Sequence, residues 1–230
     1  MRLLNQQTAM VVGQPEFVEN PENRCPVILL LDTSGSMAGA PIEALNNGLL
    51  AFKDAVIQDE QAALRVDLAI VTFGPVQLVQ DFITIDQFIP PQLKAQGLTP
   101  MGEAINYALD LLENRKVAYR NNGIQYYRPW LFLITDGAPN RDSPWIQSAD
   151  RIRNAERERK LSFFAVGVQG ADMNTLSQIA PPERPPLLLH GLDFRSMFQW
   201  LSDSMVRVSS STVGGEMVVL PPVGWGQITT

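Results

Sequence analysis

One ten-residue stretch, residues 28–37, constrains the fold of this chain more than any other. It reads ILLLDTSGSM, so an unbroken apolar run ends abruptly at an aspartate. An apolar run with no polar face is typical of a strand that is buried on both sides, as in a parallel sheet covered by helices. In such sheets, ligands bind just beyond the carboxyl ends of the strands. The stretch therefore predicts both an α/β sheet and a polar site at Asp32.

Apolar runs and helical patterns alternate along the rest of the chain. Apolar residues spaced three and four apart predict a helix over residues 42–56. Residues 64–73 predict a strand, and the Gly74-Pro75 turn returns the chain through 76–85, which indicates an antiparallel strand at a sheet edge. Further strands are predicted at 130–135, 161–168 and 187–189, and further helices around 105–112, 145–152, 173–179 and 194–205. This order favours a doubly wound α/β fold: a mostly parallel six-stranded sheet with one antiparallel edge strand and helices on both faces.

The length and composition indicate one globular domain with distinct flanks. The chain has 230 residues, of which 45% are hydrophobic and 18% charged. Residues 1–24 are predicted to form an N-terminal extension and residues 25–208 the domain itself. Residues 209–230 form either a C-terminal tail or an added edge strand, with 217–220 beside 10–12 as one arrangement of that strand.

Charge and cysteine content narrow the class of partner and the compartment. The formal net charge of −6 argues against a sequence-independent nucleic-acid binder and suits a basic partner or a bound cation. A single cysteine, Cys25, excludes an intramolecular disulfide and favours a reducing compartment, where it is expected to be a small buried side chain. The N-terminus lacks the apolar core of a signal peptide, and no window resembles a membrane span. We therefore expect a cytoplasmic protein.

Three segments place oxygen-bearing side chains at one edge of the predicted sheet. Asp32, Ser34 and Ser36 follow the first strand, Thr99 lies in a loop before a helix, and Asp136 ends the strand at 130–135. Two neighbouring carboxylates repel each other unless a cation or a proton compensates them. A cation with few protein ligands keeps waters and can accept a carboxylate from another molecule. The sequence therefore predicts a divalent cation site, with Mg²⁺ favoured and Mn²⁺ or Ca²⁺ also compatible.

The same residues have simpler structural roles available. An aspartate after a strand often caps the following turn, which would account for Asp32 alone. Thr99 before Pro100 is a good helix N-cap with proline at the first helical position. Capping by Thr99 is compatible with an approach to the metal from the same loop. The presence of all three segments favours the metal site over turn capping.

Taken together, the three segments resemble the metal-ion-dependent adhesion site (MIDAS) of von Willebrand factor type A (VWA) domains. The matching motifs are DTSGS at residues 32–36, Thr99 in GLTP and Asp136 in ITDG, and the resemblance covers about residues 25–208. It implies a mostly parallel sheet with one short antiparallel edge. It also implies a non-enzymatic protein-binding module in which a partner's Asp or Glu completes the metal shell.

The resemblance also implies how each residue would approach the metal. Ser34 and Ser36 would contact it directly, and Thr99 would do so in the ligand-competent state. Asp32 and Asp136 would bind it directly or through water. Whether Thr99 contacts the metal at rest stays open at this point.

A narrower resemblance covers mainly the first third of the chain. The motif LLLDTSGSM followed by PIEALNNGL is similar to bacterial cytosolic VWA proteins associated with tellurite resistance. That similarity implies a signalling adaptor that works with a serine/threonine kinase and a phosphatase. Either of these enzymes would then be a candidate for the partner that offers the carboxylate.

Side chains near the motif are candidates for a partner-binding rim around the metal. Trp145 is also compatible with core packing, and the charged run 151–160 with either a solvated helix face or a basic patch that docks an acidic partner. The five rim candidates are Met37, Pro100, Arg141, Asp142 and Trp145.

Two other functional classes compete with the binding module. A phosphoryl-transfer enzyme could use Asp32 as a nucleophile, but Ser34 stands where a catalytic acid is needed, and the nearest lysine is Lys53. A Ser-His-Asp hydrolase is weaker still, because Ser36 is not in a nucleophile elbow and the only histidine, His190, has no motif around it. The third alternative is a purely structural metal that holds loops together.

Overall fold

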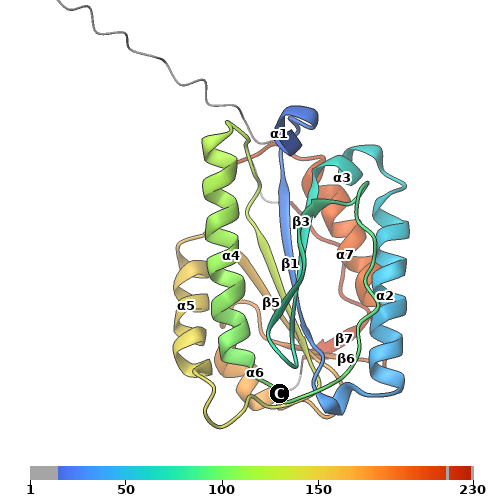
Figure 1. Ribbon diagram of the computed structural model, residues 1–230, viewed down its shortest axis with the longest axis vertical. Helices are drawn as coiled ribbons and strands as arrows, with labels where there is room; N and C mark the ends of the chain where they lie inside the picture. The colour runs from blue at the N-terminus through green and yellow to red at the C-terminus, as the bar shows by residue number, and fades with distance from the viewer. Residues whose placement is uncertain (1–14, 216–217, 229–230) are drawn as a thin grey trace, which may run out of the picture.

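The strands of this protein pair into one sheet that runs through the middle of the molecule (Figure 1). The computed structural model describes residues 15–215 and 218–228, and within them the sheet has seven strands in the order β3-β2-β1-β4-β5-β6-β7. They are β1 (Cys25–Asp32), β2 (Val66–Phe73), β3 (Gln77–Thr84), β4 (Trp130–Thr135), β5 (Ser162–Gly167), β6 (Leu187–Leu189) and β7 (Gly226–Ile228). Strands β3 and β7 are antiparallel to their neighbours and the other pairs are parallel. The predicted α/β fold is confirmed, with a second antiparallel edge strand.

Helices cover both faces of the sheet (Figure 1). One face carries α2 (Ala40–Val56), α3 (Glu60–Arg65) and α7 (Phe194–Ser209), and the other carries α4 (Met101–Asn121), α5 (Trp145–Arg157) and α6 (Met173–Ile179). Two short helices complete the set: α1 (Pro15–Glu19) before β1 and the 3-10 helix η1 (Gly35–Met37) after it. Each face has its own hydrophobic core. Within the described helices, none combines the length and apolar composition needed to span a bilayer.

Strand β1 explains why the opening apolar run has no polar face. Val27, Leu29 and Leu31 pack into the core under α2 and α7. Ile28 and Leu30 pack into the core under α4 and α5. All five side chains are fully buried, and each contributes roughly 1.5–3 kcal/mol of transfer free energy. Because β1 pairs with β2 on one side and β4 on the other, it is the strand on which both cores are built.

The carboxyl ends of β1 and β4 lie side by side. Leu31 pairs with Ile134 in the parallel register, so the next residues along, Asp32 and Thr135, end neighbouring strands. The chain leaves β1 toward β2 on one side of the sheet and reaches β4 on the other. This is the switch point at which parallel α/β sheets bind ligands.

The strand predicted at 64–73 is partly wrong. Residues 60–65 form the helix α3, and β2 begins only at Val66. Asp59 caps this helix by accepting a hydrogen bond from the backbone N–H of Ala62 (2.8 Å), which satisfies one of the free donors of the first turn. Leu64 is half-exposed on that helix, so it does not belong to the buried strand.

The added edge strand lies later in the tail than the arrangement at 217–220 proposed. Residues 218–220 are outside any strand, whereas residues 10–12 and 217 fall outside the described part of the chain. Strand β7 instead pairs with β6, and the preceding Trp225 is buried with its ring 5.8 Å from that of Trp200. Burial of this indole fixes which part of the tail reaches the sheet.

The segment before β1 packs against the amino end of the sheet. In α1, Phe17 is buried in a small cluster with helix α4. Arg115 of α4 contacts both Glu16 of α1 and the fully buried Asp67 of β2, each at 2.7 Å. Cys25, at the start of β1, is buried as predicted.

Three loops meet beyond the carboxyl end of β1 and contact one another through their backbones. Gln96 donates its backbone N–H to the carbonyl of Thr33 (2.7 Å), and Gly35 donates to the carbonyl of Gly97 (3.0 Å). Gly97 has a φ of +76°, and a Cβ built there would lie 1.7 Å from the carbonyl oxygen of Gly74. Glycine is therefore required at 97 by both its left-handed backbone and this close approach.

Substitution of Gly97 tests this loop junction. We expect Gly97→Ala to lower the free energy of unfolding by roughly 3–5 kcal/mol, because the methyl group forces two backbones apart. The matched control is Gly123→Ala, at φ +69° with nothing within 4 Å of its Cβ position. The control should lose only about 1–2 kcal/mol through left-handed strain. Urea unfolding of both variants measures the difference, and equal losses would contradict the close approach.

Candidate metal-binding site

Asp32 is the most buried member of the predicted site. It ends β1 with no exposed surface. One carboxylate oxygen, Oδ1, accepts the backbone N–H of Ser34 (2.8 Å), and the other, Oδ2, accepts the hydroxyl of Thr135 at the end of β4 (2.5 Å). The Asp32 carboxylate therefore connects two neighbouring strand ends and fixes the turn that follows β1.

Burial raises the pKa of the Asp32 carboxyl. The hydrogen bonds from Ser34 and Thr135 lower it in part, and the nearby charge of Asp136 raises it further. A carboxylate in this position is disfavoured in its charged form unless a positive charge is close. A divalent cation would remove that penalty.

Polar oxygens lead from Asp32 to Asp136. The hydroxyls of Ser34 and Ser36 lie 3.0 Å apart. The Ser36 hydroxyl donates to Oδ1 of Asp136 at 2.8 Å. Ser34 is buried, Asp136 is half-buried and Ser36 is exposed, so the cluster opens from the sheet edge toward solvent. The structure thus brings four of the five predicted ligands together through direct contacts.

Thr99, the fifth residue, lies against the loop that follows Asp136. Its backbone N–H donates to Oδ1 of Asn140, and its carbonyl accepts from the backbone N–H of Asn140, both at 3.0 Å. Its Oγ1 lies 3.8 Å from the position that a Cβ on Gly137 would take. Within the described residues this hydroxyl makes no hydrogen bond. The Thr99 hydroxyl is therefore free to approach a cation.

The predicted helix cap at Thr99 is wrong. Helix α4 starts at Met101 with Pro100 at the N-cap position, and no side chain caps it. The backbone of Thr99 is held by Asn140 instead, and the Thr99 carbonyl also accepts the N–H of Met101 at 2.8 Å. The loop bond to Asn140 therefore replaces the cap.

The donor set fits a hard divalent cation. Asp32 and Asp136 supply two carboxylates, and Ser34, Ser36 and Thr99 supply three hydroxyls, so every donor is an oxygen. Across the described part of the chain, no group of three or more His, Cys, Asp or Glu is placed to hold a metal. Two carboxylates balance a divalent charge, while hydroxyls add ligands without adding charge. Oxygen-only sites of this kind suit Mg²⁺ or Mn²⁺.

The rim residues divide between the surface and the core. Arg141 and Asp142 are exposed on the loop after Asp136, while Pro100 and Trp145 are half-buried, the latter against the core under α4. The prediction that Met37 belongs to the rim is wrong. Met37 is fully buried beneath η1 in the core under α2, because the tight 3-10 turn directs it inward, and it offers no surface to a partner.

Three residues near the site escaped the sequence analysis. Asn140 ties the Thr99 loop to the Asp136 loop, and only tertiary contacts reveal that role. Leu98 and Ile146 are large apolar side chains that are 72% and 61% exposed. Leu98 is next to Thr99 in a loop, where an apolar residue is the available signal, whereas Ile146 follows Trp145 in the first turn of α5.

Comparison with known proteins agrees with this geometry. The family model described as von Willebrand factor type A domain matches residues 27–197. No curated protein sequence matches the chain. One similar solved structure is proximal thread matrix protein 1 from the mussel byssus with a zinc-occupied MIDAS motif, at 18% identity and a TM-score of 0.54. The match covers 79% of this chain and 48% of the mussel chain, so this protein spans about half the length of that relative.

Two further structures share the fold. The vWF domain of the type V pili tip protein Mfa5 from Porphyromonas gingivalis matches with 11% identity and a TM-score of 0.60, covering 84% of this chain and 98% of that one. Manganese-loaded TRAP protein of Plasmodium vivax matches with 16% identity and a TM-score of 0.51, covering 76% and 72%. At these identities the likeness concerns the fold.

The raised pKa of Asp32 gives the metal affinity a pH dependence. A metal competes with a proton for this carboxylate, so the affinity for Mn²⁺ or Mg²⁺ should fall as the pH is lowered. The fall should begin at a higher pH than the ordinary aspartate range near pH 4 predicts. Calorimetric titration at several pH values measures it. An affinity that stays constant down to about pH 4 would contradict the burial effect.

Asp32→Asn separates the cost of the buried charge from the gain of the metal. Because the folded carboxyl holds its proton more tightly than the unfolded one, its contribution to stability falls as the pH rises through the folded pKa. At neutral pH and without metal, the variant should therefore unfold at the same or a higher temperature than the original protein.

Adding Mg²⁺ should reverse that order. At a free concentration of 100 times its Kd, the metal should stabilise the original protein by about 2.7 kcal/mol and leave the variant unchanged. Differential scanning calorimetry with and without the metal measures both effects. A metal-free variant that is clearly less stable would show that the carboxylate charge stabilises the fold.

Proposed function

Since the chain belongs to the von Willebrand factor type A domain family, we propose that it is a non-enzymatic module that binds a protein partner through a divalent cation. In this proposal Asp32, Ser34, Ser36, Thr99 and Asp136 hold the cation, and an Asp or Glu of the partner completes its shell. The cation supplies a Lewis-acidic positive charge at the surface of the sheet edge.

The gradient of exposure across the site is the observation that carries this proposal. Asp32 and Ser34 are buried, Asp136 is half-buried and Ser36 is exposed. A cation bound here would contact buried ligands on the side of the sheet and would be open to solvent on the other side. Two carboxylates balance the divalent charge, and a coordination position left open toward solvent would let a partner carboxylate bind the cation directly.

The surface around the opening favours a partner segment with apolar residues beside its carboxylate. Leu98 is exposed on the loop before α4, Arg141 on the loop after Asp136, and Ile146 in the first turn of α5. Helices α4 and α5 begin together there, because Gly102 of α4 donates its N–H to the hydroxyl of Ser143 at 2.8 Å. Contacts that surround a central one and exclude water from it are typical of protein interfaces.

We propose Mg²⁺ as the physiological cation. The site has few charged ligands and leaves room for waters, which is the coordination Mg²⁺ prefers. Zinc and manganese are the metals named for the mussel and Plasmodium relatives, so Mn²⁺ and Zn²⁺ are the competing ions to be measured alongside it.

We further propose that the module is an adaptor in a bacterial, cytoplasmic stress system of the tellurite-resistance type. The support is the similarity of residues 28–49 to such proteins and a single cysteine that is buried. A serine/threonine kinase or a phosphatase would then carry the acidic residue that reaches the metal.

The geometry disfavours a nucleophilic Asp32. Both of its oxygens accept hydrogen bonds and the side chain has no exposed surface, so a phosphoryl group has no direct approach to it. Ser34, two residues on, donates its backbone N–H to this carboxylate and cannot serve as a carboxylic acid catalyst.

Capture of partners from the native cell tests the proposal. Immobilised protein should retain its partner in Mg²⁺ and release it in EDTA, because the cation bridges the two proteins. Asp32→Ala should retain nothing in either buffer. The control is Asp54→Ala, which removes an exposed carboxylate on α2, remote from the site, and should behave like the original protein.

Two results would count against the proposal. Capture that survives both EDTA and Asp32→Ala would show that the partner does not use the cation. A metal that raises the melting temperature while no captured protein depends on it would favour the structural-metal alternative.

A further inference from the structure

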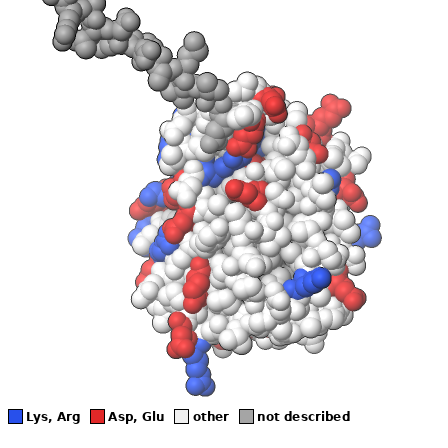
Figure 2. All heavy atoms as spheres, in the orientation of Figure 1, with Lys and Arg blue, Asp and Glu red and all other residues white. Residues whose placement is uncertain are grey.

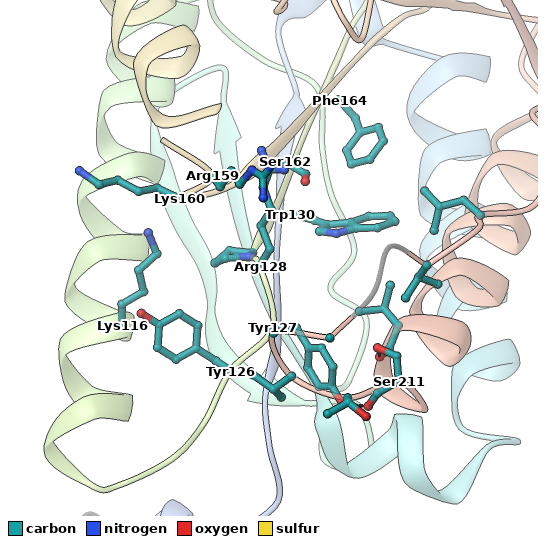
Figure 3. A pocket seen from close by; sticks show the side chains of 18 of the residues that line it. Lys116, Tyr126, Tyr127, Arg128, Trp130, Arg159, Lys160, Ser162, Phe164 and Ser211 are labelled. Atoms are coloured by element: carbon teal, nitrogen blue, oxygen red, sulfur yellow. Dashed lines mark hydrogen bonds between the residues drawn. The ribbon is translucent and has the colours of Figure 1, made fainter. Parts of the chain in front are cut away.

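A large cavity lies at the opposite end of the sheet from the metal site (Figure 3). Its volume is about 1040 Å³. Trp130 and Ser162, the first residues of β4 and β5, form part of its wall, whereas Asp136 follows the last residue of β4. Its wall also includes the end of α4, residues 126–129 before β4, the loop between α5 and β5, Arg184, and described residues between 208 and 220.

The cavity is strongly basic in a protein that is acidic overall. Among the described residues, one carboxylate, Glu113, lines it, and Glu156 and Glu158 pair with cations of its wall. Six cations lie beside these three carboxylates, so the described part of the wall has an excess of three positive charges in a chain of net charge −6. Figure 2 shows one face of the molecule, which is largely uncharged over its centre. No comparable group of cations is seen there. The six cations are Lys116, Arg120, Arg128, Arg159, Lys160 and Arg184.

Two of these arginines share a single carboxylate. Arg128 and Arg184 both form ion pairs with Glu156. Burial lowers the pKa of Arg128, and repulsion from Arg184 and Arg159 lowers it further, with Glu156 opposing. An anion placed among these guanidinium groups would relieve a repulsion that Glu156 alone does not balance.

Arg159 stands in a backbone conformation that ordinarily selects glycine. It follows the last turn of α5 with a φ of +55°. Its N–H bonds to the carbonyl of Glu156 (2.9 Å), and the N–H of Lys160 bonds to that of Ala155 (2.8 Å), which is the Schellman pattern of helix ends. Glycine usually fills this position, so arginine is held there against a steric preference.

The Arg159 side chain has no partner in the described part of the chain, neither a hydrogen bond nor an ion pair. It lines the cavity beside Lys160 and Arg128 (Figure 3). A strained residue whose charge is unused within the fold points to a ligand outside it.

The other half of the cavity is lined by aromatic side chains, with Trp130 and Phe164 tilted against each other at 39°. The rings of Trp130 and Phe164 lie 4.7 Å apart, and the guanidinium of Arg184 stacks 4.7 Å over the Phe164 ring. Figure 3 shows Lys116, Arg159 and Lys160 on one side and these aromatic rings on the other, with Arg128 between them. Aromatic walls with a few convergent charges are typical of small-molecule sites.

We propose that this cavity binds an organic phosphate with a flat ring, of the nucleoside diphosphate class. The phosphates would lie among Arg128, Arg159 and Lys160, and the ring would lie toward Trp130 and Phe164. The volume accommodates such a molecule, since ligand cavities are typically about 300–1000 Å³. A nucleic-acid strand fits less well, because the net charge of −6 would repel the phosphates that lie outside the cavity.

Calorimetric titration of the full chain in EDTA tests the proposal without a contribution from the metal site. The probes are ADP, inorganic pyrophosphate and adenosine. ADP can contact both halves of the cavity, pyrophosphate only the cationic half, and adenosine only the apolar half. ADP should bind at least about tenfold more tightly than either fragment, because only ADP uses both halves. No ADP binding at about 1 mM, or pyrophosphate binding equal to that of ADP, would overturn the proposal.

Arg159→Gly is the decisive variant, because glycine suits the left-handed position. Its melting temperature should stay the same or rise, while its ADP affinity should fall about tenfold. Arg157→Ala, which removes an exposed charge of the same helix outside the cavity wall, should leave ADP affinity unchanged. Lys160→Ala, also exposed, provides a second loss variant should Arg159→Gly disturb the fold. Unchanged ADP affinity in both Arg159→Gly and Lys160→Ala would overturn the assignment.

Discussion

The hydrogen bond between Thr135 and Asp32 is the contact on which the site end of this protein depends. It joins the ends of β1 and β4 and takes a carboxylate out of water at the same time. Burying that charge is costly, and two hydrogen bonds offset the cost only in part, as the raised pKa of Asp32 shows. A positive charge at the place where the loops converge would therefore stabilise the buried carboxylate of Asp32.

The loops around Asp32 are held by one another rather than by the sheet alone. Gly97 approaches the backbone of Gly74, and Asn140 binds Thr99 through both its backbone and its side chain. These contacts fix the Thr99 loop against the loop after Asp136 without using any of the candidate ligand oxygens. The hydroxyls and carboxylates that could bind a cation are thus positioned by neighbours that have no part in binding it.

Helices and strands with a strong hydrophobic pattern can be predicted from the sequence. Prediction fails where tertiary contacts determine the structure. The buried runs that end in Asp32 and Asp136 are legible because strands covered on both faces have no polar side, and their shared sheet edge follows from parallel pairing. The short helix α3 has too few residues for a periodic signal, and β7, with the sequence GQI, lacks the apolar run that reveals the equally short β6. Met37 and Asn140 have local sequences typical of exposed loops, and only their packing reveals that one is buried and the other joins two loops.

The two ends of the sheet differ in what supports them, and this bears on how independent they are. Four of the five candidate metal ligands lie at or just after the ends of the buried strands β1 and β4, and the fifth, Thr99, is held by Asn140. The cavity at the other end is formed by helix ends and connecting segments, where Arg159 occupies a strained position and Arg128 competes with Arg184 for one carboxylate. Strand β4, whose side chains are all buried, connects the two ends. Among the described residues, the carboxylates of Asp32 and Asp136 lie at one end, and cations outnumber carboxylates at the other. The ligands proposed for the two ends therefore carry opposite charges, and each end can be tested without the other.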